Sequence, residues 1–140
     1  MKGTYQELCT YYEGSRRTAL INQIETHYSW PSDKAERALT QYLMFLYIAS
    51  HHPGTQLVPT DEIDCVWETD ILQDTEQYIQ TCKSFCGEVI HHTGVATVQT
   101  SAAASVIQQA FETTQLLFQQ HFGQEVFAGQ ALHVAACGVL

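Results

Sequence analysis

The chain has 140 residues, of which 45% are hydrophobic, and a formal net charge of −9. This length fits a single helical domain spanning residues 1–140 that can bury its own core. Acidic residues number 15 against 6 Lys and Arg. Because phosphate binding needs clustered cations, we expect neither nucleic acid nor an anionic membrane surface as a partner. No apolar run approaches the ~20 residues that a membrane span needs, so we expect a soluble protein. The chain has five cysteines, an odd number. We therefore expect reduced thiols and a cytoplasmic location.

The first 32 residues predict two short helices. Residues 5–12 form the first, and Gly14 interrupts it. Leu20, Ile24 and Tyr28 then follow at helical spacing. The sequence Ser-Trp-Pro-Ser at residues 29–32 ends this second helix and begins a third.

Residues 33–50 are the most hydrophobic segment of the chain. Their apolar side chains cover a broad arc at helical spacing: Leu39, Tyr42, Leu43, Phe45, Leu46, Tyr47 and Ile48. An arc of this width is typical of a helix buried on most sides. We therefore predict this helix at the centre of the fold, ending at His51-His52-Pro53-Gly54.

Thr60 is a good N-cap for the next helix, and the acids at 61, 62 and 64 suit its first turn electrostatically. Ile63, Val66 and Trp67 fall on its inward face, with Trp67 expected to be structural. A turn or kink at residues 73–75 precedes an amphipathic helix predicted to end near His92.

A last helix begins near Ala104, and Gly123 is placed to cap its C-terminus. No stretch alternates with period two for long enough to require a sheet. The predicted fold class is therefore all-α, a compact bundle of about five helices.

Motifs over residues 30–124 resemble the glycine-rich domain-containing protein-like family of bacteria and plants. They comprise Tyr42 to Leu46, Leu57 to Thr60, Ile63 to Trp67, Tyr78, Cys82, His91-His92, Ala110 to Thr114 and Phe122-Gly123. The resemblance implies a shared helical fold. The family's Trp-His-x-His is Trp67-Glu68-Thr69-Asp70 here, so acids replace both histidines and any chemistry these carry does not transfer by resemblance.

Glu68, Asp70, His91 and His92 form the candidate metal site, with zinc or iron as the suited ions. Helical residues i and i+2 project about 200° apart, and i and i+1 about 100° apart. Neither pair can therefore close on one ion by itself. One residue from each pair can meet, and a third ligand is then needed. The alternative is a polar cluster that hydrogen-bonds loop backbone.

Cys82 and Cys86, at i and i+4, can present two thiolates to a metal, but their place on an apolar stripe favours core packing. The chain lacks G-x-S-x-G and a Gly-rich phosphate loop, so no catalytic residue is assigned.

The sequence leaves two functions open and favours the first. The first is a non-enzymatic protein-interaction module with no cofactor, possessing an apolar tail at residues 125–140 that packs on the bundle or in a homodimer. The alternative is a metal-binding protein or metal-dependent enzyme.

Overall fold

The computed structural model describes residues 3–92 and 101–123, with side chains of the second range described from residue 104. Six helices and no strand occur among these residues, which confirms the all-α fold. Their bounds are α1 Tyr5–Thr10, α2 Ser15–Tyr28, α3 Ser32–His51, α4 Asp61–Gln73, α5 Thr75–Cys86 and α6 Ser101–Phe122.

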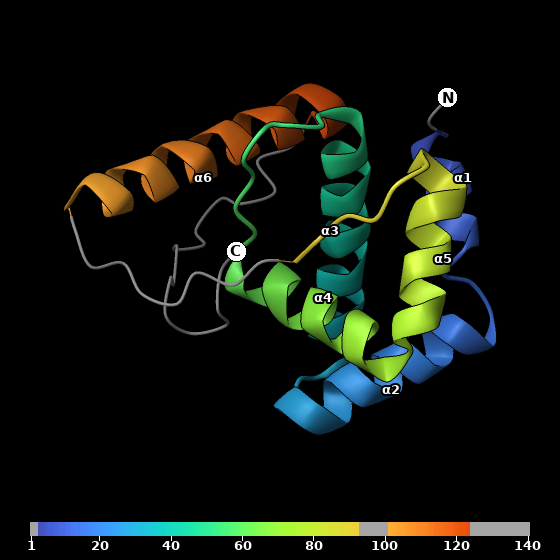
Figure 1. Cartoon of the computed structure of the whole chain (residues 1–140). Coiled ribbons are helices and arrows are strands. Elements are labelled where there is room, and N and C mark those ends of the chain that lie inside the picture. The colour runs from blue at the N-terminus through green and yellow to red at the C-terminus, as the bar shows by residue number, and fades with distance from the viewer. Residues whose placement is uncertain (1–2, 93–100, 124–140) are drawn as a thin grey trace.

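Helix α3 lies at the centre and contacts α1, α2, α4 and α6 (Figure 1). Its bounds extend one residue beyond the predicted helix at each end. Of the side chains predicted to face several neighbours, Tyr47 is half-buried and the others are buried: Leu39, Tyr42, Leu43, Phe45, Leu46 and Ile48. The broad apolar arc therefore does place this helix in the core.

Helices α4 and α5 form a tight pair joined at Asp74. Thr60 caps α4, since its Oγ1 accepts from the Ile63 N–H at 3.2 Å. Asp74 caps α5 in the same way, with Oδ1 3.0 Å from the Gln77 nitrogen. The predicted turn at residues 73–75 is thus a complete break between two helices.

The end of α5 differs from the sequence-based expectation. The helix stops at Cys86 because Gly87 adopts the left-handed conformation, with φ of 86°, a conformation that glycine adopts without steric cost. The prediction of a helix reaching His92 was therefore wrong at this end. Residues 87–92 instead form an extended segment that runs back toward α4 (Figure 1).

Helix α6 crosses the end of α3 at which α3 terminates, so that the C-terminal ends of the two helices meet (Figure 1). Ile107, Ala110, Phe111 and Phe118 are buried on its inner face. Thr114 also ties α6 to the loop before α4, because its Oγ1 accepts from the Val58 N–H at 2.9 Å. These contacts fix the position of His121 in the last turn of α6.

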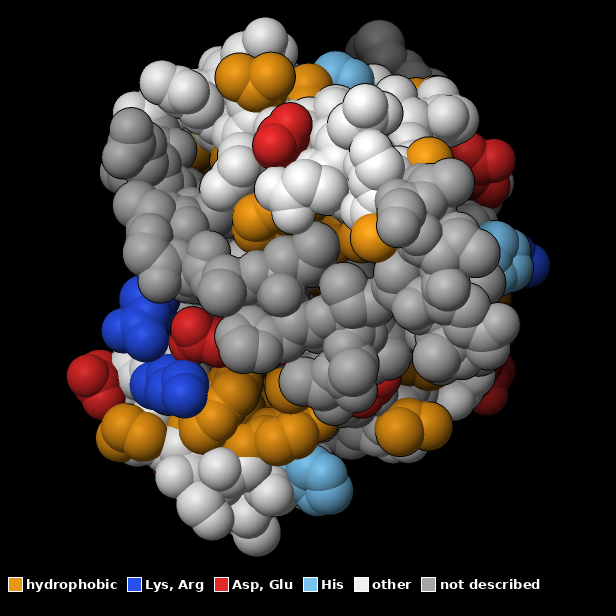
Figure 2. Space-filling view, turned by 90° about the vertical axis from the view of Figure 1, so that its left-hand side faces the viewer, with side chains coloured by type: hydrophobic (Ala, Val, Ile, Leu, Met, Phe, Trp, Pro, Cys, Tyr) orange, Lys and Arg blue, Asp and Glu red, His pale blue; other side chains and the backbone are white. Residues whose placement is uncertain are grey.

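The apolar tail predicted at residues 125–140 lies outside the described residues. Across the described helices, none combines the length and hydropathy that crossing a lipid bilayer requires. On the face shown in Figure 2, the basic side chains at the left have acidic side chains beside them. The described part of that face therefore carries no extended basic surface.

Candidate metal centre

Helix α4 carries two carboxylates on one face. The Asp64 N–H donates to the Thr60 carbonyl at 2.9 Å, which places Asp64 in the first helical turn. Glu68 follows four residues later, the spacing at which helical side chains are neighbours. The inward packing of Ile63 and Trp67 orients this face, and Asp64 is 0% exposed.

His92 reaches the same place from the segment after α5. Tyr78 of α5 holds this segment, since its hydroxyl donates to the Ile90 carbonyl at 2.5 Å. The same hydroxyl accepts from the Trp67 indole nitrogen at 2.8 Å. The Trp67 ring meets the His92 ring edge to face, with centroids 4.5 Å apart. Trp67 and Tyr78 therefore position His92 against α4.

The three side chains form a compact cluster. His92 Nε2 lies 2.5 Å from Asp64 Oδ1, and one potential ligand atom from each of Asp64, Glu68 and His92 lies within 4.8 Å of the others. Asp64 Oδ2 is buried and has no hydrogen-bond partner among the described residues. A buried charged oxygen without a partner is costly. A cation between the three groups would satisfy it.

The electrostatics of the cluster favour an added positive charge. Burial raises the pKa of Glu68, and the negative charge of Asp64 raises it further. Burial lowers the pKa of His92, but the hydrogen bond and charge of Asp64 and the charge of Glu68 outweigh it, so the net shift is upward. When the His92 ring is protonated, its proton supplies one positive charge to the cluster. A divalent ion would replace that proton and supply one charge more.

Of the four residues predicted as ligands, Glu68 and His92 lie in this cluster, whereas Asp70 and His91 lie elsewhere. The Asp70 carboxylate accepts from the hydroxyls of Tyr12 at 2.7 Å and Tyr42 at 2.6 Å. Arg16 Nη2 lies 3.6 Å from its other oxygen. Because Asp70 is two residues from Glu68, it faces the opposite side of α4, as the helical geometry requires.

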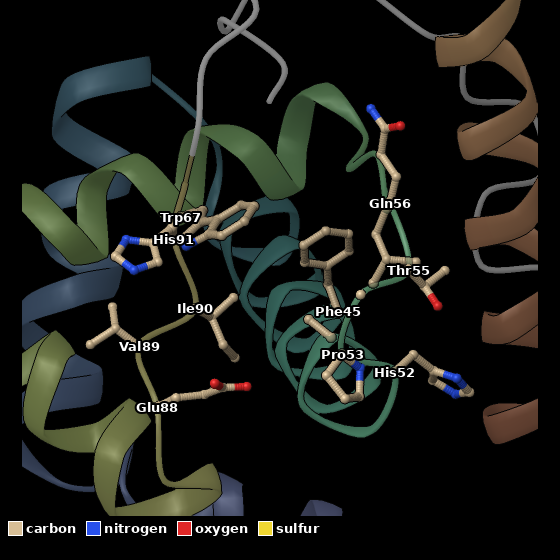
Figure 3. Close-up of a pocket in the computed structure, with 13 residues that line it drawn as sticks. Phe45, His52, Pro53, Thr55, Gln56, Trp67, Glu88, Val89, Ile90 and His91 are labelled. Carbon is tan, nitrogen blue, oxygen red and sulfur yellow. The ribbon is translucent and has the colours of Figure 1, made fainter.

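His91 lines a pocket of about 470 Å³, and Trp67 forms part of the same lining. Figure 3 shows Ile90 and Phe45 among its apolar walls and Glu88 at its edge. The pocket also borders Pro53 and Leu57 from the loop after α3. His91 therefore faces a cavity that does not contain the cluster residues.

Asp64 is the candidate ligand that the sequence patterns did not identify. Its position in a helix first turn is expected for electrostatic reasons alone, so it was not singled out. The i, i+4 spacing of Asp64 and Glu68 was the available signal. It supplies the third group that the predicted set lacked.

A second pocket, of about 380 Å³, adjoins the cluster through Glu68. Helix α2 contributes His27 and Tyr28 to its wall, and α4 contributes Thr69 and Leu72. Burial raises the pKa of Tyr28 to about 12, so its hydroxyl stays protonated at neutral pH. The pocket gives the Glu68 side of the cluster an approach from solvent.

Scans of this chain against protein-family models, curated proteins and solved structures found no match. The resemblance to the glycine-rich domain-containing protein-like family therefore stays a prediction. The functional argument depends on the site itself.

Proposed function

We propose that this chain is a metal-binding protein that holds one divalent transition-metal ion, zinc or iron, through Asp64, Glu68 and His92. The observation that carries the proposal is the convergence of these three groups on a buried, unpartnered oxygen of Asp64. Carboxylate and imidazole ligands suit both ions. Binding requires the His92–Asp64 contact to open so that the ion takes the place of the shared proton.

Three protein ligands leave a coordination position open, as in catalytic zinc sites. A water molecule in that position would be acidified by the ion and become a nucleophile near neutral pH. The pocket beside Glu68 is where a substrate would approach such a water. The proposal therefore extends to a metal-dependent hydrolytic enzyme, for which this pocket would be the substrate site.

The test is elemental analysis of protein purified without added metal or chelator, followed by Zn²⁺ titration of the metal-free protein. Wild type should carry or bind about one ion at this site, whereas Glu68→Gln and His92→Gln should each weaken binding at least about tenfold. Glu62→Gln is the matched control, because Glu62 lies on the same helix and pairs with Arg37 at 3.5 Å instead. Equal affinity in wild type and both site variants would refute the proposal.

Protein interaction, self-association included, is the second candidate function. Large apolar side chains are exposed on described helices, with Leu72 of α4 at 80% and Val106 and Leu116 of α6 at 51% and 58%. Exposed apolar side chains favour association where they gather into one patch. Light scattering on the full chain and on a chain ending at Gln124 tests this role. A dimer that dissociates in the shorter chain supports it, and monomers in both cases oppose it.

A further inference from the structure

Two histidines from distant parts of the sequence meet where α3 and α6 end. His52 follows the last residue of α3, and His121 lies in the last turn of α6. Their Nε2 atoms are 2.8 Å apart. In Figure 3 His52 points away from the pocket toward α6. The contact is the only one between two histidine ring nitrogens in the described hydrogen bonds.

The spacing of the two nitrogens is close to that of two ligands on one ion. Zinc–imidazole bonds of about 2.0–2.1 Å at tetrahedral angles separate the nitrogens by about 3.3 Å. A small rotation of either ring, opening the contact by about 0.5 Å, therefore makes room for an ion. The metal-free arrangement needs one neutral ring to donate to the other.

The helix ends around His52 and His121 favour a bound cation. The C-terminal ends of α3 and α6 both meet at this point (Figure 1), and each helix end carries partial negative charge.

A third imidazole lies nearby. His51 has its ring centroid 6.4 Å from that of His121. Its Nδ1 lies 3.0 Å from the Tyr47 carbonyl, and 2.9 Å from a Ser50 hydroxyl that itself donates to that carbonyl. These partners favour a proton on Nδ1 and leave the lone pair on Nε2. A backbone carbonyl in this role is the usual outer partner of a metal-ligating histidine.

We propose that His52 and His121 form a second metal site, for an imidazole-preferring ion such as Zn²⁺, Ni²⁺ or Cu²⁺, that clips α6 to α3. Water, or His51 after a side-chain rotation, completes the coordination. This site differs in chemistry from the Asp64–Glu68–His92 cluster, since its ligands are imidazoles without carboxylates. The proposal of this second site does not depend on the proposal that the cluster binds a metal.

The experiment is calorimetric titration of the tag-free chain with Ni²⁺ at about pH 7.5, where imidazole is neutral. A Glu68→Gln background weakens the first site, and the binding heat that is then lost on changing either histidine reports on the histidine pair. We expect Ni²⁺ binding in this background to fall at least about tenfold in both His52→Gln and His121→Gln. His91→Gln is the matched control, because His91 is exposed and lines a different surface.

Thermal unfolding tests whether the metal ion links α6 to α3 and so stabilises the fold. Ni²⁺ should raise the thermal midpoint of the background protein and of the His91→Gln control, and EDTA should reverse the rise. The rise should vanish in both pair variants, whose folding is checked by circular dichroism without metal. Unchanged Ni²⁺ affinity in either pair variant would overturn the proposal, because the site needs both rings. Zn²⁺ binding that is weakened but still present in Glu68→Gln, with Ni²⁺ affinity unchanged, would separate the two sites.

Discussion

At the scale of single residues, Asp70 shows how one polar side chain can be structural although its sequence context suggests a ligand. It is 5% exposed, and two tyrosine hydroxyls and an arginine surround its carboxylate. Burial raises the pKa of Asp70, and the hydrogen bonds from Tyr42 and Tyr12 counteract this. The network joins the turn after α1 to α2, α3 and α4, so its partners lie far apart in sequence.

Tyr42→Phe should destabilise the fold by about 1.5–3 kcal/mol, because it removes a hydrogen bond to a buried charged group. It should also raise the pKa of Asp70 further, since the lost hydroxyl stabilises the ionised form. Urea unfolding measures the first effect and carboxyl NMR the second. Tyr47→Phe on the same helix is the control, because the described contacts of its side chain are ring contacts. Similar losses in both variants would argue against a special role for the Asp70 network.

The pH dependence of metal affinity is a second prediction at this scale. A metal ion must displace the proton of His92, and the pKa of His92 is raised above its ordinary 6.5. Zn²⁺ affinity should be constant above the raised pKa and fall about tenfold for each pH unit below it. The fall should begin at a higher pH than an unperturbed histidine would give. Calorimetry in a His121→Gln background, from about pH 8.5 to about 5.5, tests this. A flat profile would remove His92 from the ligand set.

At the scale of elements, sequence patterns identified most of the helices. The apolar arc of α3 and the Thr60 cap of α4 are local signals, and both are present in the structure. The end of α5 was missed because Val89 and Ile90 continue the apolar period past Gly87. Those two side chains are instead half-buried from an extended segment. The glycine was the stronger signal, since it permits the left-handed turn that ends the helix.

The same turn explains why only part of the candidate site was predictable. Glu68 and Asp64 share a face of α4, which their spacing alone indicates. Their meeting with His92 depends on the reversal at Gly87 and on the contact between Tyr78 and Ile90. Both are tertiary features. The sequence thus indicated the ligand types, and the fold selected which of them meet.

Tyr78→Phe should affect both stability and metal binding. It leaves the buried Trp67 N–H without its acceptor and releases the Ile90 carbonyl, at a cost of about 1–3 kcal/mol. Because the Ile90 contact positions His92, Zn²⁺ affinity should fall about tenfold or more. Tyr12→Phe is the matched control: it also removes a buried hydroxyl bond, to Asp70, away from the cluster. Destabilisation in both variants with weakened metal binding only in Tyr78→Phe is the expected result. Equal Zn²⁺ affinity in the two would contradict the positioning role of Tyr78.

At the scale of the whole molecule, the cluster joins the helical core to the extended segment after α5. Helix α4 packs against α2, α3 and α5, so Asp64 and Glu68 are fixed by the bundle. His92 ends the described segment after α5 and is held by Trp67 and Asp64. A metal at this point would tie the segment to the core. Since the ligands converge only in the folded chain, binding and folding are linked.

Metal addition should therefore raise the stability of the entire domain. An ion that binds only the native state stabilises it by about 2.7 kcal/mol at a free concentration near 100 times Kd. For a chain of 140 residues this corresponds to a rise of roughly 5–10 °C in Tm. Calorimetry with Zn²⁺ and then EDTA measures the rise and its reversal, in a His121→Gln background so that only the Asp64–Glu68–His92 site contributes. His92→Gln should abolish the rise and His91→Gln should retain it, because the two neighbours face different surroundings. An equal rise in both would show that the stabilising ion binds elsewhere.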